Sequence, residues 1–422
     1  MMQEVNDHDQ PGPGSVPVPQ SFPDYAMDTR KLAAIEFSLS WSSAYARHRD
    51  RYYIGRVDFW RDILPDGMDK ALPQMASGQT YEQAFAAGSL VPEHSPRSIV
   101  SFPRSQVNGT NVELQSGRFY PRGIAWRPLN SFPENLTPMR LLEVSEETVV
   151  VDLNHPLAGV PVSIGAEIKE TREIGPQRGG TVQDIAEILT GNGPGMQVPL
   201  NPSGIYEDGS YPYPRENEED DRLFYRNPRM VHHLDDTARA HVSSLYAGLL
   251  EPGARVLDLM SSWHSHISPS HSSCSIAGLG LNEEEMRSNS ALTEFKVHDL
   301  NRQPVLPYQD GSFDAAVCTV SIEYLSRPRE IMKELARVLV PGGLFAAVVS
   351  ERWFPGKQIV RWSDLHPFER QGLLLSYFIN EPGFADIQSE SIRGYPRPSD
   401  DRYGGQELFS DPLYAVWARR MR

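Results

Sequence analysis

The sequence has few cysteines and no long apolar run. Only Cys274 and Cys318 occur among 422 residues, a usage that argues against an oxidising compartment and favours the cytoplasm. No apolar run approaches the ~18 residues of a membrane span. The first 24 residues lack the basic and then apolar layout of a secretory signal. We therefore expect a cytoplasmic protein with no membrane partner.

The sequence also lacks an excess of basic residues. Forty Lys and Arg stand against 55 Asp and Glu, which gives a net charge of -15. This balance argues against nucleic acid or an anionic membrane as the partner. A chain of this length predicts two or three domains. Residues 1–30 are rich in proline and are expected to be disordered.

Strand-like and helix-like segments alternate from residue 235 onward. A helical period over 235–250 leads into apolar strands at 254–260, 275–281, 294–300 and 313–325, then a helix at 327–343 and a strand at 344–350. This order predicts an α/β, Rossmann-like domain with a mainly parallel sheet. Open sheets of this kind bind ligands beyond the carboxyl ends of their strands, where Asp258, Gly280 and Asp299 fall.

Three segments carry a family resemblance. They are "VLDL" at 256–259, the phrase at 306–346 that begins "LPYQDGSFDAAV", and "DPLYAVWAR" at 411–419. Over about 235–420 the chain resembles the class I, type 11, S-adenosylmethionine-dependent methyltransferases, which implies that cofactor and a methyl acceptor of unknown nature. The resemblance implies a cofactor site made of Asp258, Met260, Ser261, Ser262, His266, Gly280, Leu281, Asn282, Asp299 and Leu300.

Two features of that family are missing. Glycines normally follow the first strand, because a residue without Cβ allows left-handed φ and close ligand approach, but Met260, Ser261 and Ser262 stand there. We expect the two hydroxyls and His266 to replace those backbone contacts. Gly280 replaces the acid that holds the ribose, so Asn282 or Glu283 is expected to substitute. An acid placed at 280 is expected to strengthen binding if Gly280 faces the ribose.

Two polar clusters are interpreted as non-functional. His264, His266, His271 and Cys274 lie close in sequence but match no standard zinc spacing, so no metal is predicted. The acidic run at 216–221 is most simply a solvated turn.

The first half is rich in short strand-like runs from 31 to 174. The segment "VVVDLNHPLAGVPVSIGAEI" at 149–168 resembles SlyD-like FKBP-type peptidyl-prolyl isomerases. This resemblance implies an α+β half-barrel with an inserted β-rich flap at about 101–152 and an X-Pro-containing or unfolded polypeptide as partner. Asp50 is the candidate for the family's pocket aspartate. The resemblance assigns the pocket wall to Phe37, Ile63, Leu64, Met68, Phe85 and Leu157.

The predicted organisation is a disordered segment (1–30), an FKBP/SlyD-like domain (31–175), a linker and turn-rich connector (176–234) and a methyltransferase-like domain (235–422). The predicted function is an isomerase or chaperone-like domain fused to a methyltransferase with a variant cofactor loop. Two alternatives stay open. One is a non-catalytic protein-binding module with a pseudo-methyltransferase scaffold, and the other is a small-molecule methyltransferase with an FKBP-derived appendage.

Overall fold

The computed structural model describes residues 31–108, 113–173, 180–201, 211–268 and 273–422. The segment predicted to be disordered, 1–30, and His271 lie outside the described residues. So do parts of the predicted flap, at 109–112, and of the predicted connector, at 176–179 and 202–210. No helix in the described ranges is long and apolar enough to cross a membrane.

The second half of the chain forms an open sheet with the strand order β11-β10-β9-β12-β13-β15-β14. Neighbours from β11 to β13 run parallel, and β15 is antiparallel to both of its neighbours. The predicted α/β order of elements is therefore confirmed. The strands are β9 (Arg255–Leu259), β10 (Ser275–Gly280), β11 (Glu294–Val297), β12 (Phe313–Thr319), β13 (Leu339–Ser350), β14 (Phe384–Arg393) and β15 (Leu413–Arg420).

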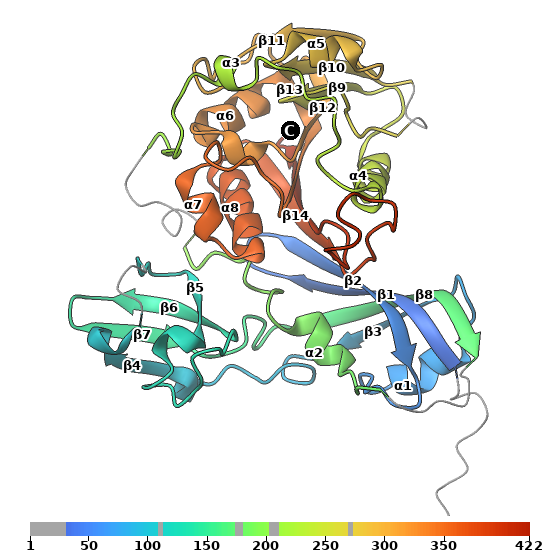
Figure 1. Cartoon of the computed structure of the whole chain (residues 1–422), viewed down its shortest axis with the longest axis vertical. Helices are drawn as coiled ribbons and strands as arrows, with labels where there is room; N and C mark the ends of the chain where they lie inside the picture. The colour runs from blue at the N-terminus through green and yellow to red at the C-terminus, as the bar shows by residue number, and fades with distance from the viewer. Residues whose placement is uncertain (1–30, 109–112, 174–179, 202–210, 269–272) are drawn as a thin grey trace, which may run out of the picture.

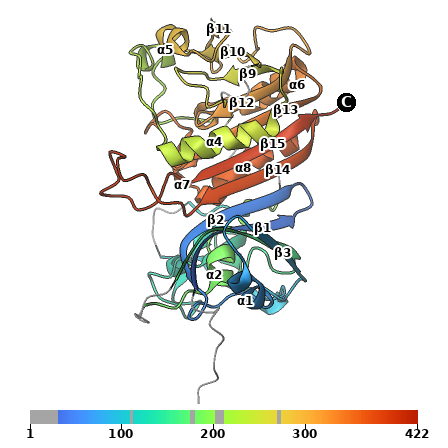
Figure 2. The same ribbon diagram turned by 90° about the vertical axis from the view of Figure 1, so that its right-hand side faces the viewer.

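Helices cover both faces of this sheet (Figure 2). Consecutive strand residues point to opposite faces, so Val256 packs in the apolar cluster that contains α4, while Leu257 packs in the cluster that contains α6 and α8. The Asp235 side chain caps α4 by accepting from the Ala238 N–H at 3.1 Å. The helices are α4 (Asp236–Leu249), α5 (Glu283–Ser288), α6 (Pro328–Val338), α7 (Val360–Asp364) and α8 (Pro367–Asn380).

The same sheet continues into the first half of the chain. β14 pairs in parallel with β2, and the order then runs β2-β1-β8-β3, which makes a single 11-stranded sheet (Figure 1). A shared sheet was not expected from the predicted domain boundaries. The strands of the first half are β1 (Lys31–Ser42), β2 (Arg47–Asp58), β3 (Thr80–Phe85) and β8 (Val162–Glu173), with the short helix α1 (Met68–Ala71) between β2 and β3.

Asp50 lies at the seam between the two halves. Its carboxylate is buried and accepts hydrogen bonds from Trp41 Nε1 at 3.0 Å, Ser391 Oγ at 2.8 Å and Gln197 Nε2 at 3.3 Å. These partners come from β1, from β14 and from the segment after α2 (Ile185–Thr190). One side chain therefore connects three parts of the chain.

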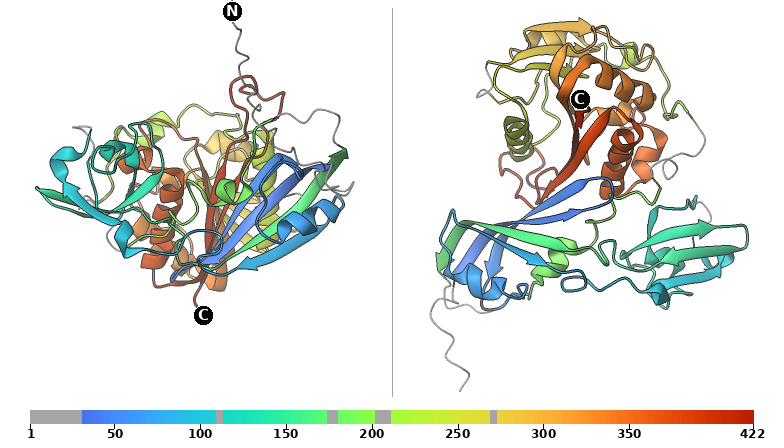
Figure 3. Two further views of the ribbon diagram at one scale, coloured as in Figure 1. Left: turned by 90° about the horizontal axis from the view of Figure 1, so that it is seen from below. Right: turned by 180° about the vertical axis from the view of Figure 1, so that it is seen from behind.

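A separate four-stranded sheet of order β4-β7-β6-β5 is inserted between β3 and β8. It stands to one side of the main sheet and has its own apolar cluster (Figure 3). Glu369 of α8 accepts from the Phe119 N–H at 2.9 Å, so the inserted sheet also contacts the second half. Its strands are β4 (Ile99–Pro103), β5 (Phe119–Pro121), β6 (Pro138–Val144) and β7 (Thr148–Asp152).

The connector is more structured than a linker. It contains α2 and α3 (Asp221–Phe224), and Asp221 is 5% exposed. The Asp221 carboxylate pairs with Arg215 at 2.7 Å and with the fully buried Lys357 at 3.0 Å. The prediction that the acidic run is a solvated turn is therefore wrong for Asp221, because a fixed charge pair holds this part of the run inside the fold.

Candidate functional site

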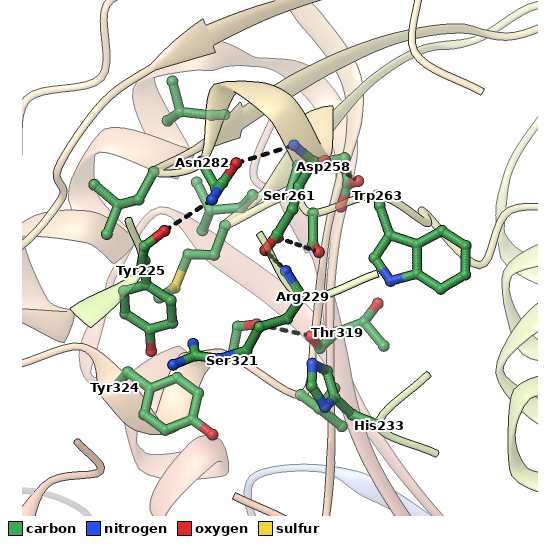
Figure 4. Close-up of a pocket in the computed structure, with 18 of the residues that line it drawn as sticks. Tyr225, Arg229, His233, Asp258, Ser261, Trp263, Asn282, Thr319, Ser321 and Tyr324 are labelled. Atoms are coloured by element: carbon green, nitrogen blue, oxygen red, sulfur yellow. Dashed lines mark hydrogen bonds between the residues drawn. The ribbon is translucent and has the colours of Figure 1, made fainter. Parts of the chain in front are cut away.

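A cavity lies at the carboxyl ends of β9, β10 and β12 (Figure 4). Parallel strands bring the residues that follow them to one edge of the sheet, so turns far apart in sequence meet there. All ten residues that the sequence indicated for the cofactor site line this cavity. They are Asp258, Met260, Ser261, Ser262, His266, Gly280, Leu281, Asn282, Asp299 and Leu300.

The chain turns after β9 over residues 260–266, which we call the Ser-rich turn. The Asp258 carboxylate fixes the conformation of this turn. Asp258 Oδ2 accepts from Ser261 Oγ at 2.6 Å and from Ser265 Oγ at 2.7 Å. Asn289 Nδ2 donates to Ser265 Oγ at 2.8 Å and to the Ser262 carbonyl at 2.9 Å. The hydroxyl protons of Ser261 and Ser265 therefore hold the turn itself, and the expected contact of the Ser261 hydroxyl with the cofactor stays a prediction.

Met260 supplies the backbone conformation that a glycine would normally supply. Its φ is +57°, in the left-handed region that non-glycine residues seldom adopt. His266, at the other end of the turn, has a φ of +56°. Such conformations persist where the surroundings determine them, and the bonds to Asp258 and Asn289 provide that constraint.

Burial raises the pKa of Asp258 to about 6, although the hydrogen bonds from Ser261 and Ser265 lower it. Its other oxygen, Oδ1, has no hydrogen-bond partner among the described residues. The group is therefore ionised near neutral pH, at a cost in stability, and keeps an acceptor free beside the cavity.

Gly280 is packed against the Ser-rich turn. A Cβ on Gly280 would lie 2.2 Å from the Ser261 carbonyl oxygen and 3.1 Å from Met286 Sδ. The Ser261 N–H also donates to the Leu279 carbonyl at 2.8 Å. The expectation that an acid at 280 strengthens binding is therefore wrong, because backbone occupies the space that its side chain needs.

Asn282 and Glu283 are engaged outside the cavity centre. Asn282 Oδ1 accepts the Glu285 N–H at 3.0 Å as the cap of α5, and its Nδ2 donates to the Tyr225 carbonyl at 2.8 Å. Glu283 pairs with Arg287 on the surface. Neither carries out the expected substitution for the missing acid, because each side chain has another partner.

Asp299 follows β11 and lines the cavity with Leu300. Its Oδ1 accepts the N–H groups of Asn301 at 3.1 Å and of Arg302 at 3.2 Å. Oδ2 makes no hydrogen bond with any described residue. The turn thus fixes one oxygen of the carboxylate and leaves the other for a ligand.

His266 belongs to a group of rings above the cavity. The ring centroids of His264 and His266 lie 4.6 Å apart, and those of His232 and Trp263 lie 4.5 Å apart. Burial lowers the pKa of His266 to about 3, and its Nδ1 is buried without a partner. In the described ranges, no group of three His, Cys, Asp or Glu is arranged to hold a metal ion.

The connector supplies residues that sequence reasoning missed. The guanidinium carbon of Arg229 lies 4.5 Å from the ring centre of Phe224 and 4.9 Å from that of Phe354. The main-chain N–H of Arg229 donates to Glu285 Oε1 at 2.7 Å. Trp263 Nε1 donates to the Val231 carbonyl at 3.1 Å. The connector therefore covers the cavity, and its aromatic, Arg and His residues were the available signal.

Val320, which follows β12, lines both this cavity and a second, neighbouring cavity. The second cavity is also lined by Tyr52, Phe368 and Arg393. Val320 has a φ of +42°, which is an outlier for a β-branched residue. Its N–H donates to the Val348 carbonyl at 2.7 Å, and Ser321 Oγ donates to the Thr319 carbonyl at 2.9 Å. Strain at this position is typical of a functional edge.

The six residues predicted for the isomerase pocket behave differently. Phe37, Leu64, Met68, Phe85 and Leu157 all belong to the apolar core of the first half, and three of them are completely buried. Ile63 is 54% exposed. Their packing is that of a core, so the assignment of a pocket to them stays a prediction.

Comparisons with known proteins concern the second half most directly. A family model described as a methyltransferase domain matches residues 265–347, and no curated protein matches the chain. The (4+2)-cyclase SpnF is 19% identical with a TM-score of 0.34, over 50% of this chain and 99% of that one. The YcgJ protein from Bacillus subtilis is 16% identical with a TM-score of 0.32, over 43% and 99%.

A third structure, a SAM-dependent methyltransferase from Aquifex aeolicus, is 16% identical with a TM-score of 0.30, over 48% of this chain and 97% of that one. The family match lies wholly in the second half, so the FKBP-like identity of the first half is not established by it. The match begins at residue 265, near the end of the turn that follows β9, and covers β10, β11, β12 and most of β13. Asp258, Met260, Ser261 and Ser262 precede it. The comparisons therefore show that residues 265–347, in the second half of the chain, are similar to a methyltransferase domain.

Proposed function

We propose that the cavity at the ends of β9, β10 and β12 binds S-adenosylmethionine and that the protein transfers its methyl group to an acceptor. The observation that carries this proposal is the convergence of all ten predicted residues on one cavity. The turn that replaces the family's glycines keeps its backbone in the required left-handed conformation at Met260. The departure from the glycine pattern is therefore compatible with a working site.

Two carboxylates fit the polar ends of the cofactor. We assign Asp299 Oδ2 to the adenine amino group, since its other oxygen is fixed by the turn at 299–302. We assign Asp258 Oδ1 to the ammonium of the methionine part, since Oδ2 is fixed by two hydroxyls. Gly280 offers the ribose no carboxylate, so the main chain at 281–282 is the nearest group for that contact.

The cavity is narrow in this structure. Its volume is about 140 Å³, whereas ligand pockets commonly measure roughly 300–1,000 Å³. In the covering segment at 225–234, the polar contacts with the rest of the domain include those of Trp263 with Val231, Asn282 with Tyr225 and Glu285 with Arg229. We expect this cover to move outward when the cofactor is admitted.

The cofactor supplies an electrophilic methyl group on a positively charged sulfur. A lone pair of the acceptor atom forms the new bond to the methyl carbon as the carbon–sulfur bond breaks, and sulfur keeps that electron pair. Alignment of the two reactants contributes most of the acceleration in such a step. His233 lines the cavity at the border with the second one, and burial lowers its pKa, so its neutral ring is available to accept the acceptor's proton.

Calorimetric titration of S-adenosylmethionine and S-adenosylhomocysteine into the full chain tests the proposal. Asp299→Ala removes one hydrogen bond to the adenine, which costs about 1–3 kcal/mol, or roughly 5- to 150-fold in affinity. Asp310→Ala is the matched control, because Asp310 is exposed and its one ion-pair partner among the described residues is Arg337. Absence of binding by the well-folded wild type at millimolar ligand would favour the non-catalytic scaffold.

For the first half we propose an FKBP-like domain that binds X-Pro-containing or unfolded polypeptide. Two observations support the proposal. The inserted sheet, 99–152, coincides with the flap expected at 101–152, and five of the six pocket candidates belong to one cluster. Prolyl isomerisation of a short peptide and of an unfolded protein, with Phe85→Ala as the variant, is the test. Unchanged rates in the variant would reject the pocket assignment.

A further inference from the structure

A second cavity of about 1030 Å³ adjoins the proposed cofactor cavity. The two share the 231–234 segment, Val320, Tyr324 and Phe354. Its walls come from both halves of the chain, since Tyr52 belongs to β2 whereas Phe368 and Arg393 belong to α8 and β14. We propose that this cavity is the acceptor site, and that it takes a small aromatic molecule bearing a carboxylate or phosphate. This inference rests on the proposed methyl transfer and names its substrate class.

The anionic group is inferred from Arg393. The guanidinium carbon lies 5.1 Å from the ring centre of Tyr52 and 4.7 Å from that of Phe368. Nε and Nη2 are buried without a hydrogen-bond partner, and Arg393 forms no ion pair with any described residue. Asp50 attracts this cation from a neighbouring strand. A half-buried guanidinium whose N–H groups lack acceptors is still costly, and its shape suits carboxylate or phosphate oxygens.

Two other cations of this wall, Arg352 and Arg397, are already neutralised, and the remaining one, Arg402, is exposed. Arg397 pairs with Asp411 at 2.5 Å and with Glu407 at 2.7 Å, and Arg352 pairs with Asp411 at 2.7 Å. Among the acids, Asp235 Oδ2 accepts the Asp411 N–H and Ser410 Oγ. Glu351 accepts only the Tyr414 hydroxyl, at 3.1 Å, among the described residues. Arg393 is thus the cation that a ligand can neutralise.

The aromatic body is inferred from the remaining lining. Rings from both halves face the cavity, and flat ligands stack on such rings in offset or edge-to-face arrangements. The volume suits one molecule of drug-like size and is too small for a folded protein domain. The ring-bearing side chains, apart from those that flank Arg393, include Tyr324, Trp353, Phe354, Tyr403, Phe409 and Tyr414.

The shared sheet places Arg393 beside a ring of the first half. Register pairs Arg393 of β14 with Tyr52 of β2, next to the pair formed by Ser391 and Asp50. The parallel pairing therefore places a ring of the first half against the cation of the second. In this arrangement the first half completes the acceptor site.

Binding of small aromatic probes to the full chain, saturated with S-adenosylhomocysteine, tests the proposal by calorimetry. The probes are 4-hydroxybenzoate, its neutral methyl ester and phenyl phosphate, which separate carboxylate, neutral and phosphate ligands. We expect at least one anion to bind more tightly than the ester. Arg393→Met should lower the affinity for that anion about 10- to 100-fold and leave the affinity for the ester unchanged.

Arg402→Met is the matched control, since Arg402 lies exposed in the same wall and its loss should change binding by about twofold or less. Arg393→Lys keeps the charge without the planar fork and should fall between wild type and Arg393→Met. Binding of S-adenosylhomocysteine by each variant reports folding and separates failure of the cofactor proposal from failure of this one. Equal binding of ester and anions, no binding of any probe, or full binding by Arg393→Met would overturn the proposal.

Discussion

A Cβ on Gly280 would lie 2.2 Å from the carbonyl oxygen of Ser261. This contact joins the two positions at which the sequence departs from the pattern of the methyltransferases it resembles, the turn after β9 and the end of β10. The Ser-rich turn occupies the volume beside residue 280 with its own backbone. The two departures are therefore physically coupled, because a larger residue at 280 is compatible only with a turn placed elsewhere.

Gly280→Ala is expected to destabilise the protein and to weaken cofactor binding. Overpacking of a well-packed site costs about 1–3 kcal/mol, and here the neighbour is backbone that cannot rotate away. Gly248→Ala is the control, because a Cβ there meets nothing within 4 Å and Gly248 lies within α4. Thermal unfolding of both variants should show a lower Tm for the first and an unchanged or higher Tm for the second. A normal Tm and normal affinity in Gly280→Ala would show that the turn can shift freely.

Asp258→Asn is expected to change stability with pH. Because burial raises the pKa of Asp258 from 3.8 to about 6, the folded wild type binds its proton more tightly than the unfolded chain does. This contribution to stability is fully present below pH 3.8 and is lost as pH rises through about 6. At pH 7 the ionised Asp258 lowers the free energy of unfolding by about 3 kcal/mol relative to the protonated form.

The asparagine variant has no such ionisation. Its free energy of unfolding should therefore exceed that of wild type near pH 7, with the difference shrinking toward pH 4. Its affinity for S-adenosylmethionine should fall, since the ammonium loses a charged acceptor. Denaturant unfolding at several pH values, with calorimetry at pH 7, measures both effects. A pH-independent difference in stability would contradict the assignment of the raised pKa to Asp258.

The order of strands and helices in the second half could be predicted because apolar periodicity and turn residues fix it locally. The convergence of the ten candidate residues on one cavity could be predicted as well, since strand ends of a parallel sheet meet at one edge. Side-chain partners could not be predicted. Ser261 donates to Asp258 and Ser262 to Glu285, and a hydroxyl in a turn can equally face a ligand or its own fold.

Contacts between residues far apart in the sequence could not be predicted. The pairing of Asp50 with Ser391 joins positions 341 residues apart, and no periodicity within β2 or β14 indicates which edges will meet. Connector residues such as Arg229 are polar or aromatic without a regular period, so they resemble a loop. Only the folded arrangement shows that this loop covers the cavity.

His233 is expected to make cofactor binding depend on pH. Burial lowers its pKa below 6.5, so its ring is neutral at pH 7 and becomes cationic only in more acid solution. A cationic ring at the cavity border repels the sulfonium of S-adenosylmethionine but not the neutral sulfur of S-adenosylhomocysteine. As pH drops through the pKa of His233, the affinity for S-adenosylmethionine should therefore fall relative to the affinity for S-adenosylhomocysteine.

His233→Gln should abolish that pH dependence while leaving both affinities at pH 7 within about twofold of wild type. Calorimetric titrations of both ligands across the acid range measure the ratio directly. His232→Gln is the matched control, because that neighbouring ring lies against Trp263 at 4.5 Å with the two ring planes tilted by 31°. A pH dependence that persists in the His233 variant and disappears in the control would assign the effect to the neighbouring ring.

The last prediction concerns the seam at Asp50. Asp50→Ala leaves Trp41 Nε1, Gln197 Nε2 and Ser391 Oγ without their common acceptor in a buried site, and each buried group without a partner costs about 1–3 kcal/mol. Because those donors belong to β1, the connector and β14, the loss should weaken the union of the two halves more than either core. We expect one cooperative transition in wild type and a lower, broadened or split transition in Asp50→Ala by calorimetry. Asp66→Ala, an exposed position on the turn before α1, is the control and should melt as wild type does. A single transition at the wild-type temperature in Asp50→Ala would mean that backbone pairing of β14 with β2 alone joins the halves.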